Sequence, residues 1–416
     1  MLVELAKGKG IEKVEVPDKN IIEVLKPNEV KVELTGMAEV ERALENPIGA
    51  PKLSEIVKPG ESVAIITSDI TRPIPSYKVL PPVLNELKKA GCDMKDVVVV
   101  FALGSHRAHT EDEMIHLVGE EVYKEVRCID CDPKDCVHMG TSKMGTPYDV
   151  FRPVAEADRV ICLGNIEYHY FAGYSGGAKA IMPGVCTRAA IQSNHSRMVM
   201  DTAHAGKLDG NPVREDIDEV AEYRHIDYIV NVVLDAHKEI IRAVAGDYIK
   251  AHREGCKFLD TLYKIEIPKR ADIVLVSPGG FPKDINLYQA QKSLDNSKHA
   301  VREGGIVILC ASCKEGLGEG CFEKWMTTSP SIDFMVEEIQ RNFQLGGHKA
   351  AAIAMVMQKS KVFLVSDMDP EFVKSIFFTP FKTVEEAYAA AKAQLGEDAS
   401  VIVMPYGGST LPSSKK

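Results

Sequence analysis

The chain has 416 residues, 45% of them hydrophobic and 26% charged, with a formal net charge of -10. This negative balance argues against a nucleic-acid partner or an anionic membrane surface, and the sequence has neither a signal-peptide pattern nor an apolar run of membrane-spanning length. We therefore expect a cytoplasmic protein. A length beyond that of most single cores predicts two domains.

Apolar β-branched runs alternate with helical patterns through the first part of the chain, which is typical of βαβ units around a parallel sheet. Thr110 and Glu113 form a capping box, which predicts a helix start at Thr110. The predicted strands are 62–69, 96–106, 157–165 and 226–235, and the predicted helices are 76–91 and 110–126.

After a helical stretch at 246–263 the pattern restarts, with strands predicted at 271–280, 304–312, 361–368 and 400–408. The predicted fold class is α/β, with two α/β domains, mainly parallel sheets and an active site in the cleft between the domains. We expect an N-terminal domain over 1–266, with the tail 402–416 packing back on it, and a C-terminal domain over 267–401.

Polar side chains gather just after four predicted strands, where parallel sheets place functional groups. Each cluster has an ordinary explanation as helix caps, structural histidines or solvated cations. Four clusters at strand ends that point the same way nevertheless predict a shared active site. The clusters are Asp69, Thr71 and Arg72; His106, Arg107 and His109; Glu167, His169 and Lys179; and Lys283, Asp284, Tyr288, Gln289 and Lys292.

The stretch "HYFAGYSGGAKAIMPG", residues 169–184, nearly matches a phosphate-binding loop. It lacks the glycine before the lysine and the hydroxyl after it, because Ala178 and Ala180 flank Lys179. The glycines would let a bulky group approach the backbone beside Lys179. His195 follows 16 residues later, as a surface histidine at a helix start, a proton carrier or a ligand for nickel, copper or zinc.

Ten cysteines without regular spacing suit reduced thiols better than a disulfide framework. Cys128, Cys131, Cys136 and His138 have spacings compatible with a tetrahedral zinc site. The alternative is a short strand running into an Asp-Pro turn, in which the sulfurs do not converge. Cys310 and Cys313 are predicted to pack at the end of a strand.

Five motifs, "DITRP", "GSHRAHT", "HYFAGYSGGAK", "NHS" and "YQAQK", closely resemble the lactate racemase family over essentially the whole chain. That resemblance implies a nickel-pincer nucleotide, nickel pyridinium-3,5-bisthiocarboxylic acid mononucleotide, joined to Lys179 as a thioamide. It also implies that His195 is the protein ligand of nickel, in the square-planar geometry that Ni(II) favours. Nucleotide contacts carry over to Asp69, Thr71 and Tyr288.

The same resemblance assigns acid/base roles to His106 and His169. It gives Arg72 and Lys292 the task of orienting the substrate, and makes Gln289 a polar substrate contact. The implied activity is a 2-hydroxyacid racemase that works by proton-coupled hydride transfer to the nucleotide. The substrate is lactate or another 2-hydroxy acid such as malate, an aromatic acid or a sugar acid, and cofactor-synthesis enzymes are expected partners. His109 receives no role beyond that of a neighbour of the helix cap.

Two other functions are compatible with an α/β fold and a cationic, histidine-rich site. An NAD-dependent 2-hydroxyacid dehydrogenase would need a G-x-G-x-x-G after the first strand, which the sequence lacks. A catalytically silent cofactor-binding relative would have no need to keep His106, His169, Lys179 and His195 together.

Overall fold

A computed structural model describes residues 1–72, 74–104, 106–235 and 237–414. Pro73 and Ser105, which belong to two of the quoted motifs, lie outside the described residues. The chain divides into two compact units. The middle unit is Val30–Asp260, and the terminal unit combines Met1–Glu29 with the chain from Thr261 onward.

The middle unit is built on a six-stranded sheet in the order β13-β12-β9-β4-β5-β6. Neighbouring strands are parallel except for the pair β12 and β13. Val63, Ala64, Ile65 and Ile66 of β4 have no exposed surface, as expected for a central strand covered on both faces. The strands are β4 (Val63–Ser68), β5 (Val97–Ala102), β6 (Arg127–Asp130), β9 (Arg159–Asn165), β12 (Tyr228–Leu234) and β13 (Ile240–Gly246).

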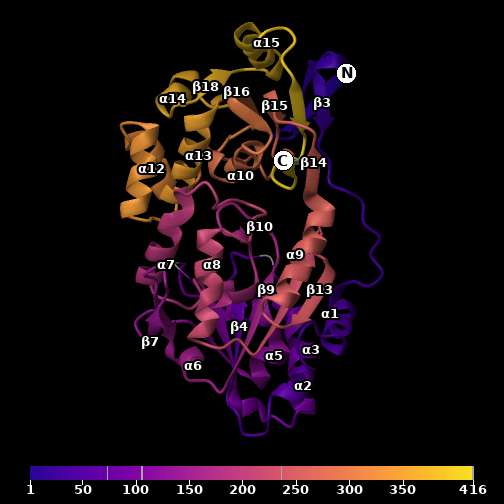
Figure 1. Ribbon diagram of the computed structural model, residues 1–416, viewed down its shortest axis with the longest axis vertical. Helices are drawn as coiled ribbons and strands as arrows, with labels where there is room; N and C mark the ends of the chain where they lie inside the picture. Colours follow the sequence, from indigo (N-terminus) through magenta and orange to yellow (C-terminus); the bar gives the residue numbers. More distant parts are fainter. Residues whose placement is uncertain (73, 105, 236, 415–416) are drawn as a thin grey trace. The chain divides into compact units, whose positions relative to one another are not determined.

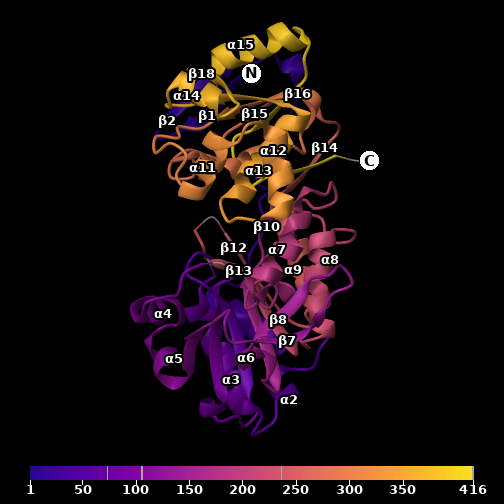
Figure 2. The same cartoon turned by 90° about the vertical axis from the view of Figure 1, so that its left-hand side faces the viewer.

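Helices cover both faces of this sheet. Figure 2 shows α3 (Ser76–Lys89), α4 (Glu111–Val118) and α5 (Glu120–Glu125) on one side. The other side carries α7 (Arg188–His195), α8 (Pro212–Asp218) and the hairpin of β7 (Cys136–Thr141) and β8 (Pro147–Phe151). The remaining helices of this unit are α1 (Gly36–Glu45), α2 (Leu53–Ile56), α6 (Arg152–Ala155) and most of α9 (Lys250–Tyr263).

The terminal unit holds a second six-stranded sheet, in the order β18-β17-β16-β15-β19-β3, with all neighbours parallel. Its strands are β3 (Ile21–Val24), β15 (Ala271–Val276), β16 (Val301–Cys310), β17 (Lys361–Val365), β18 (Thr379–Phe381) and β19 (Val401–Met404). Its helices are α10 (Leu287–Ser297), α11 (Gly320–Thr328), α12 (Ile332–Arg341), α13 (Gly347–Lys359), α14 (Pro370–Ser375) and α15 (Val384–Leu395). Two mainly parallel α/β sheets confirm the predicted fold class.

The division of the chain differs from the predicted one at both ends. The first 29 residues belong to the terminal unit, where β1 (Leu2–Lys7) and β2 (Gly10–Glu15) form a hairpin and β3 pairs with β19. The tail strand β20 (Leu411–Ser414) pairs with β14 (Lys264–Ile267), and both strands lie in this same unit. Residues 1–29 join the terminal unit because β3 pairs with β19, which lies nearly the whole chain away.

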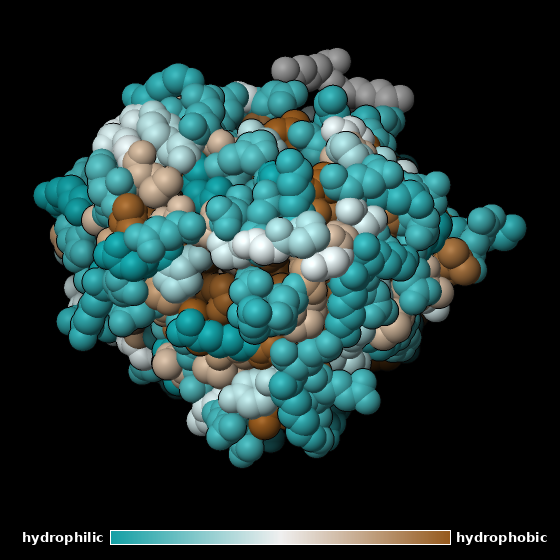
Figure 3. Space-filling view, turned by 90° about the horizontal axis from the view of Figure 1, so that it is seen from below, coloured by the Kyte–Doolittle hydropathy of each residue, from teal (hydrophilic) through white to brown (hydrophobic). Residues whose placement is uncertain are grey.

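The Thr110 hydroxyl accepts a hydrogen bond from the Glu113 backbone N–H, and the Glu113 carboxylate accepts one from the Thr110 backbone N–H, which confirms the predicted capping box. Among the described residues, no helix has both the length and the apolar character needed to cross a bilayer. The face seen from below is mainly hydrophilic, with apolar residues showing in a hollow near its middle (Figure 3).

Candidate active site

The loops that follow β4 and β5 bring Asp69, Thr71 and His106 together. The buried Asp69 carboxylate lies 2.6 Å from His106 Nδ1 and accepts a 2.8 Å hydrogen bond from the Thr71 hydroxyl. Burial raises the pKa of Asp69, but His106, Thr71 and Arg72 outweigh it and hold the pKa below its usual value. An ionised Asp69 can only accept, so the His106 proton resides on Nδ1 and the lone pair on Nε2.

His109 ties two strand-end loops together. Its Nδ1 lies 2.6 Å from the Asp130 carboxylate at the end of β6, and its Nε2 accepts a 3.1 Å hydrogen bond from the Ile70 backbone N–H. The ring is almost fully buried and meets Phe101 edge-on, with centroids 5.1 Å apart. His109 is therefore more than a cap neighbour, because it holds the backbone beside Asp69.

His169 lies on the short strand β10 (Tyr168–His169), which pairs with β11 (Gly173–Tyr174). Its Nδ1 accepts a 3.2 Å hydrogen bond from the Ala172 N–H, which places the proton of the neutral ring on Nε2. Burial lowers the pKa of His169 well below 6.5, and the charges of Lys179, Arg72, His195 and Arg214 lower it further. In the middle unit, Arg72, Lys179 and His195 are therefore close enough to His169 for their charges to act on it.

Lys179 sits in the 3₁₀ turn Gly177–Ala180 that follows the glycines. Burial and then Arg214 and Arg72 lower the pKa of Lys179 well below 10.5. The glycines here accommodate protein atoms. A Cβ on Gly173, which has φ +77°, would meet the Lys207 carbonyl, and one on Gly176, at φ +80°, would meet the Asn231 side chain.

His195 ends helix α7 and is 7% exposed. Its Nδ1 lies 2.8 Å from Asn194 Oδ1. The Asn194 amide nitrogen donates to the Val213 carbonyl and to Asp216, so the oxygen must face the ring and accept. Nδ1 of His195 therefore carries the proton, and its lone pair is on Nε2, the arrangement of a metal-ligating imidazole oriented by a neighbour.

Asp216 is a fully buried carboxylate that the sequence reasoning missed. It accepts hydrogen bonds from Ser142, at 2.5 Å, and from Thr146 and Asn194, at 2.7 Å each, and it pairs with Arg197 at 3.3 Å. These contacts fix helix α7, which carries His195, against the β7–β8 hairpin. No local spacing in the sequence signals this network.

The other three predicted residues, Tyr288, Gln289 and Lys292, lie in the first two turns of α10 in the terminal unit. The Asn286 side chain caps this helix by accepting from the Gln289 N–H. Lys349, which the sequence analysis did not select, lies with its Nζ 3.7 Å from the Tyr288 ring centroid and donates to the Tyr288 carbonyl. Gln289 and Lys292 are exposed.

Two residues of the predicted clusters have structural contacts instead. Asp284 is buried and accepts from the backbone N–H groups of Gly8 and Ser312. Arg107 forms an exposed ion pair with Glu113, at 2.6 Å. Neither contact requires a ligand.

The cysteine cluster does not converge on one point. Cys131 Sγ accepts from the Leu103 N–H, Cys136 Sγ contacts the Asp132 carbonyl, and His138 pairs with Asp149 at 2.7 Å. In the part of the chain that the structure describes, no group of three or more His, Cys, Asp or Glu side chains is arranged to hold a metal. This matches the strand-and-turn alternative, and Cys310 packs in the core of the terminal unit.

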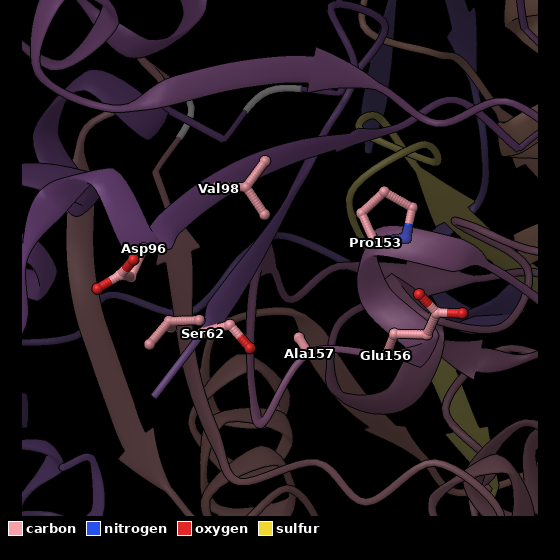
Figure 4. Close-up of a pocket in the computed structure, with 7 residues that line it drawn as sticks. Ser62, Asp96, Val98, Pro153, Glu156 and Ala157 are labelled. Atoms are coloured by element: carbon pink, nitrogen blue, oxygen red, sulfur yellow. The ribbon is translucent and has the colours of Figure 1, made fainter. Parts of the chain in front are cut away.

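A hollow at the opposite end of the middle sheet can be set aside as a site for 2-hydroxy acids. Figure 4 shows Ser62, Asp96, Pro153 and Glu156 among the residues that line it, near the amino ends of β4 and β5. Its two charged lining residues are carboxylates, which would repel an acidic substrate.

His252 of helix α9 is a buried imidazole that packs against the glycine turn. It donates from Nε2 to the Ser175 carbonyl at 2.8 Å and accepts from Arg253 at Nδ1, also at 2.8 Å. Burial, followed by Arg214 and Arg253, lowers the pKa of His252 well below 6.5. Folding therefore keeps this ring neutral.

Acidification is expected to destabilise the middle unit through His252. Below about pH 6.5 the His252 ring binds a proton in the unfolded chain but stays neutral in the folded protein. The free energy of unfolding therefore falls by about 1.4 kcal/mol for each pH unit, until the pH reaches the pKa of the folded state. Urea unfolding followed by circular dichroism between pH 8 and 5 measures this slope. His252→Gln should flatten the slope by that amount, and equal slopes in the two proteins would contradict the assignment.

Family models and relatives agree on the identity of the chain. Models of the lactate racemase N-terminal and C-terminal domains match residues 7–206 and 267–411. The lactate racemase of Thermoanaerobacterium thermosaccharolyticum is 33% identical over 425 residues, covering 99% of each chain. That of Lactiplantibacillus plantarum is 33% identical over 378 residues, covering 88% of this chain and 89% of the other.

One solved structure supports the same family, and a second supports the fold. The lactate racemase apoprotein from Thermoanaerobacterium thermosaccharolyticum superimposes with a TM-score of 0.88 at 32% identity, covering 99% of this chain and 100% of that one. A Thermotoga maritima protein shares the fold, with a TM-score of 0.63 at 19% identity, covering 92% of this chain and 100% of that one. The chain belongs to the lactate racemase family.

Proposed function

We propose that the protein racemises a small 2-hydroxy acid, with lactate as the first candidate, and that it does so with a nickel-pincer nucleotide joined to Lys179. The family supplies the reaction class and the cofactor. The observation that carries the proposal in this chain is the opposite protonation of its two candidate acid/base histidines.

His106 and His169 differ in which ring nitrogen holds the proton. Asp69 keeps the His106 proton on Nδ1, so its Nε2 can take a proton from a substrate hydroxyl. The Ala172 N–H occupies His169 Nδ1, so its Nε2 carries the proton of the neutral ring and can donate a hydrogen bond to a substrate carbonyl oxygen. One base and one hydrogen-bond donor at the substrate oxygen suit the oxidation of a 2-hydroxy acid to a keto acid, and inversion follows if the two rings address opposite faces.

The residues of the middle unit fit the cofactor. Burial and two nearby guanidinium groups favour an unprotonated Lys179, as a covalent bond to an acyl group requires. His195 is oriented by Asn194 with its lone pair on Nε2, which is a suitable donor for nickel. When bound, the nucleotide supplies a hydride acceptor, which no protein side chain provides.

Arg72 is the candidate clamp for the substrate carboxylate. It is exposed, and its charge acts on both His169 and Lys179. A guanidinium can bind a carboxylate through two parallel hydrogen bonds, which fixes its orientation. Lys292 and Gln289 on α10 remain predicted substrate contacts, as does Tyr288 for the nucleotide. Asp69 and Thr71 also remain predicted nucleotide contacts, although in this structure they orient His106.

A panel of single-enantiomer 2-hydroxy acids tests the proposed function. The protein is made together with the cofactor-synthesis enzymes and given lactate, malate, an aromatic hydroxy acid or a sugar acid, and the products are resolved by chiral chromatography. We expect lactate to be converted to the racemate. If only another acid of the panel is racemised, the proposed mechanism stands and that acid replaces lactate as the substrate. If none of the acids is converted, the proposal is contradicted.

His195→Ala is expected to keep the covalent nucleotide but lose nickel more readily. The imidazole supplies one ligand to the metal, whereas attachment depends on Lys179. Intact-mass analysis measures the nucleotide, and nickel content after dialysis against a chelator measures retention. His204→Ala, a half-buried histidine of the same unit, serves as the control. Equal nickel in wild type and His195→Ala would place the ligand elsewhere.

A further inference from the structure

Arg214 of helix α8 is a cation with no exposed surface that lies against the glycine turn. Its Nη2 donates to the Tyr174 carbonyl at 2.7 Å, and its two terminal nitrogens lie 3.4 and 3.5 Å from the Gly176 carbonyl oxygen. Burying a guanidinium costs free energy unless hydrogen bonds and charged partners compensate for the lost hydration. These partners are the backbone of the segment that leads to Lys179.

The charges around Arg214 do not cancel. Asp218 is the carboxylate that pairs with it, at 3.2 Å, and the same carboxylate also pairs with Arg253, at 2.6 Å. His252, which contacts Arg253, is kept neutral by burial and by the two arginines. Two guanidinium groups therefore share the Asp218 carboxylate, so this carboxylate does not fully neutralise Arg214.

The turn connects this charge to the anchor lysine. The Gly176 carbonyl oxygen that faces Arg214 also accepts a hydrogen bond from the Lys179 N–H, at 3.4 Å. Within the described ranges, the charged and titratable groups that interact with Lys179 are Arg214 from α8, Arg72 from the loop after β4, His169 from β10 and His252 from α9. All four are basic, and none offers an ammonium group a counter-charge.

We propose that Arg214 is a positioning residue for cofactor attachment: it holds the turn that presents Lys179 and places a buried positive charge against that turn, which favours acylation of the lysine amine. This inference rests on the proposed function in taking Lys179 as the anchor. It goes beyond that function in explaining why this lysine is chemically distinct.

The chemistry of attachment requires the neutral amine. Its nitrogen lone pair attacks the carbon of an activated acyl or thioacyl donor, the C–N bond forms, the leaving group departs with its bonding electrons, and the amine proton passes to solvent. An ammonium nitrogen has no lone pair for this step. The low pKa of Lys179, set by burial first and by Arg214 next, is consistent with an amine held ready at neutral pH.

Trace acetylation of the cofactor-free protein with acetic anhydride measures this property directly. The acetylation rate of Lys179 is followed by peptide mass spectrometry from pH 6 to 10, with the exposed Lys31 as internal reference. In wild type, the pH midpoint for Lys179 should lie at least about one unit below that of Lys31, which is a tenfold larger neutral fraction at the same pH. Equal midpoints would overturn the inference.

Four variants distinguish an effect of the Arg214 charge on Lys179 from an effect of misfolding. Arg214→Gln should raise the Lys179 midpoint by about one unit or more, whereas Arg214→Lys, which keeps the charge, should leave it low. Asp218→Asn removes the shared carboxylate and should move the midpoint in the opposite direction, downward. Arg152→Gln, an exposed arginine of the same unit, should match wild type.

The outcomes separate this inference from the proposed function. A midpoint that is the same in wild type and Arg214→Gln, or that rises in Asp218→Asn, overturns it even if the protein racemises lactate. If Arg214→Gln does not fold, Arg214→Lys and Asp218→Asn still decide, because a raised midpoint in either contradicts the role of the charge. The expected shifts in a protein that racemises nothing would support the role of Arg214 and refute the racemase.

Discussion

Replacing either His106 or His169 with alanine is expected to lower kcat for racemisation about 10²- to 10⁴-fold in both directions, the usual cost of losing a positioned acid or base. Each direction needs one histidine to take the hydroxyl proton and the other to return a proton to the carbonyl oxygen. The holo variants should retain their nucleotide, because Lys179 is unchanged. Progress from each enantiomer is followed by chiral chromatography.

A single-turnover experiment separates this two-histidine scheme from a scheme with one base. Each variant is mixed with one enantiomer, quenched in acid, and analysed for the 2-keto acid. With two histidines, His169→Ala should oxidise the enantiomer for which His106 Nε2 is the base. His106→Ala should oxidise only the other enantiomer, after the His169 ring proton has moved from Nε2 to Nδ1. A variant that treats both enantiomers alike would show that a single imidazole serves both faces. Replacing His116, a histidine on α4, with alanine provides the control.

Lys179→Ala is expected to abolish both cofactor attachment and racemisation. The cofactor is proposed to be joined covalently to the lysine amine, and alanine has no amine with which to form that bond. Intact-mass analysis after co-expression with the cofactor-synthesis enzymes should show an added nucleotide in wild type and none in the variant. Lys143→Ala, which removes an exposed lysine of the same unit, should keep the added mass.

Two results would contradict the anchor. Wild-type protein of unmodified mass after co-expression would mean that the chain does not take the cofactor covalently. An adduct that persists in Lys179→Ala would mean that another nucleophile carries it. Peptide mapping of the adduct in Lys179→Ala distinguishes the second case from non-covalent carry-over.

The central strands of the two sheets were predictable because they are buried on both faces and therefore form continuous apolar runs. β4, β5, β9 and β12 all fall within predicted segments. β3 was missed, since its four residues acquire a role only through pairing with β19. A short edge strand carries too little periodicity to be found without its partner.

The residue types of the candidate site could be predicted from the sequence, but the tautomers of its histidines could not. Strand-end position and the family motifs selected His106 and His169. The partners that set their tautomers, Asp69 and the Ala172 N–H, act through hydrogen-bond directions that spacing does not encode. Arg214 was not selected at all, because the carbonyls that it binds, on Tyr174 and Gly176, lie 40 and 38 residues earlier in the chain.

The pairing of β3 with β19 also determines the order in which the chain can fold during synthesis. The middle unit is one continuous segment, so it can be completed once the ribosome has released residue 260. The terminal unit must wait for β19, at Val401–Met404, before β3 can take its place at the edge of the sheet. A nascent chain therefore carries the β1–β2 hairpin and the unpaired strand β3 throughout the synthesis of the middle unit, and chaperone binding at this stage should concentrate on Leu2–Val24.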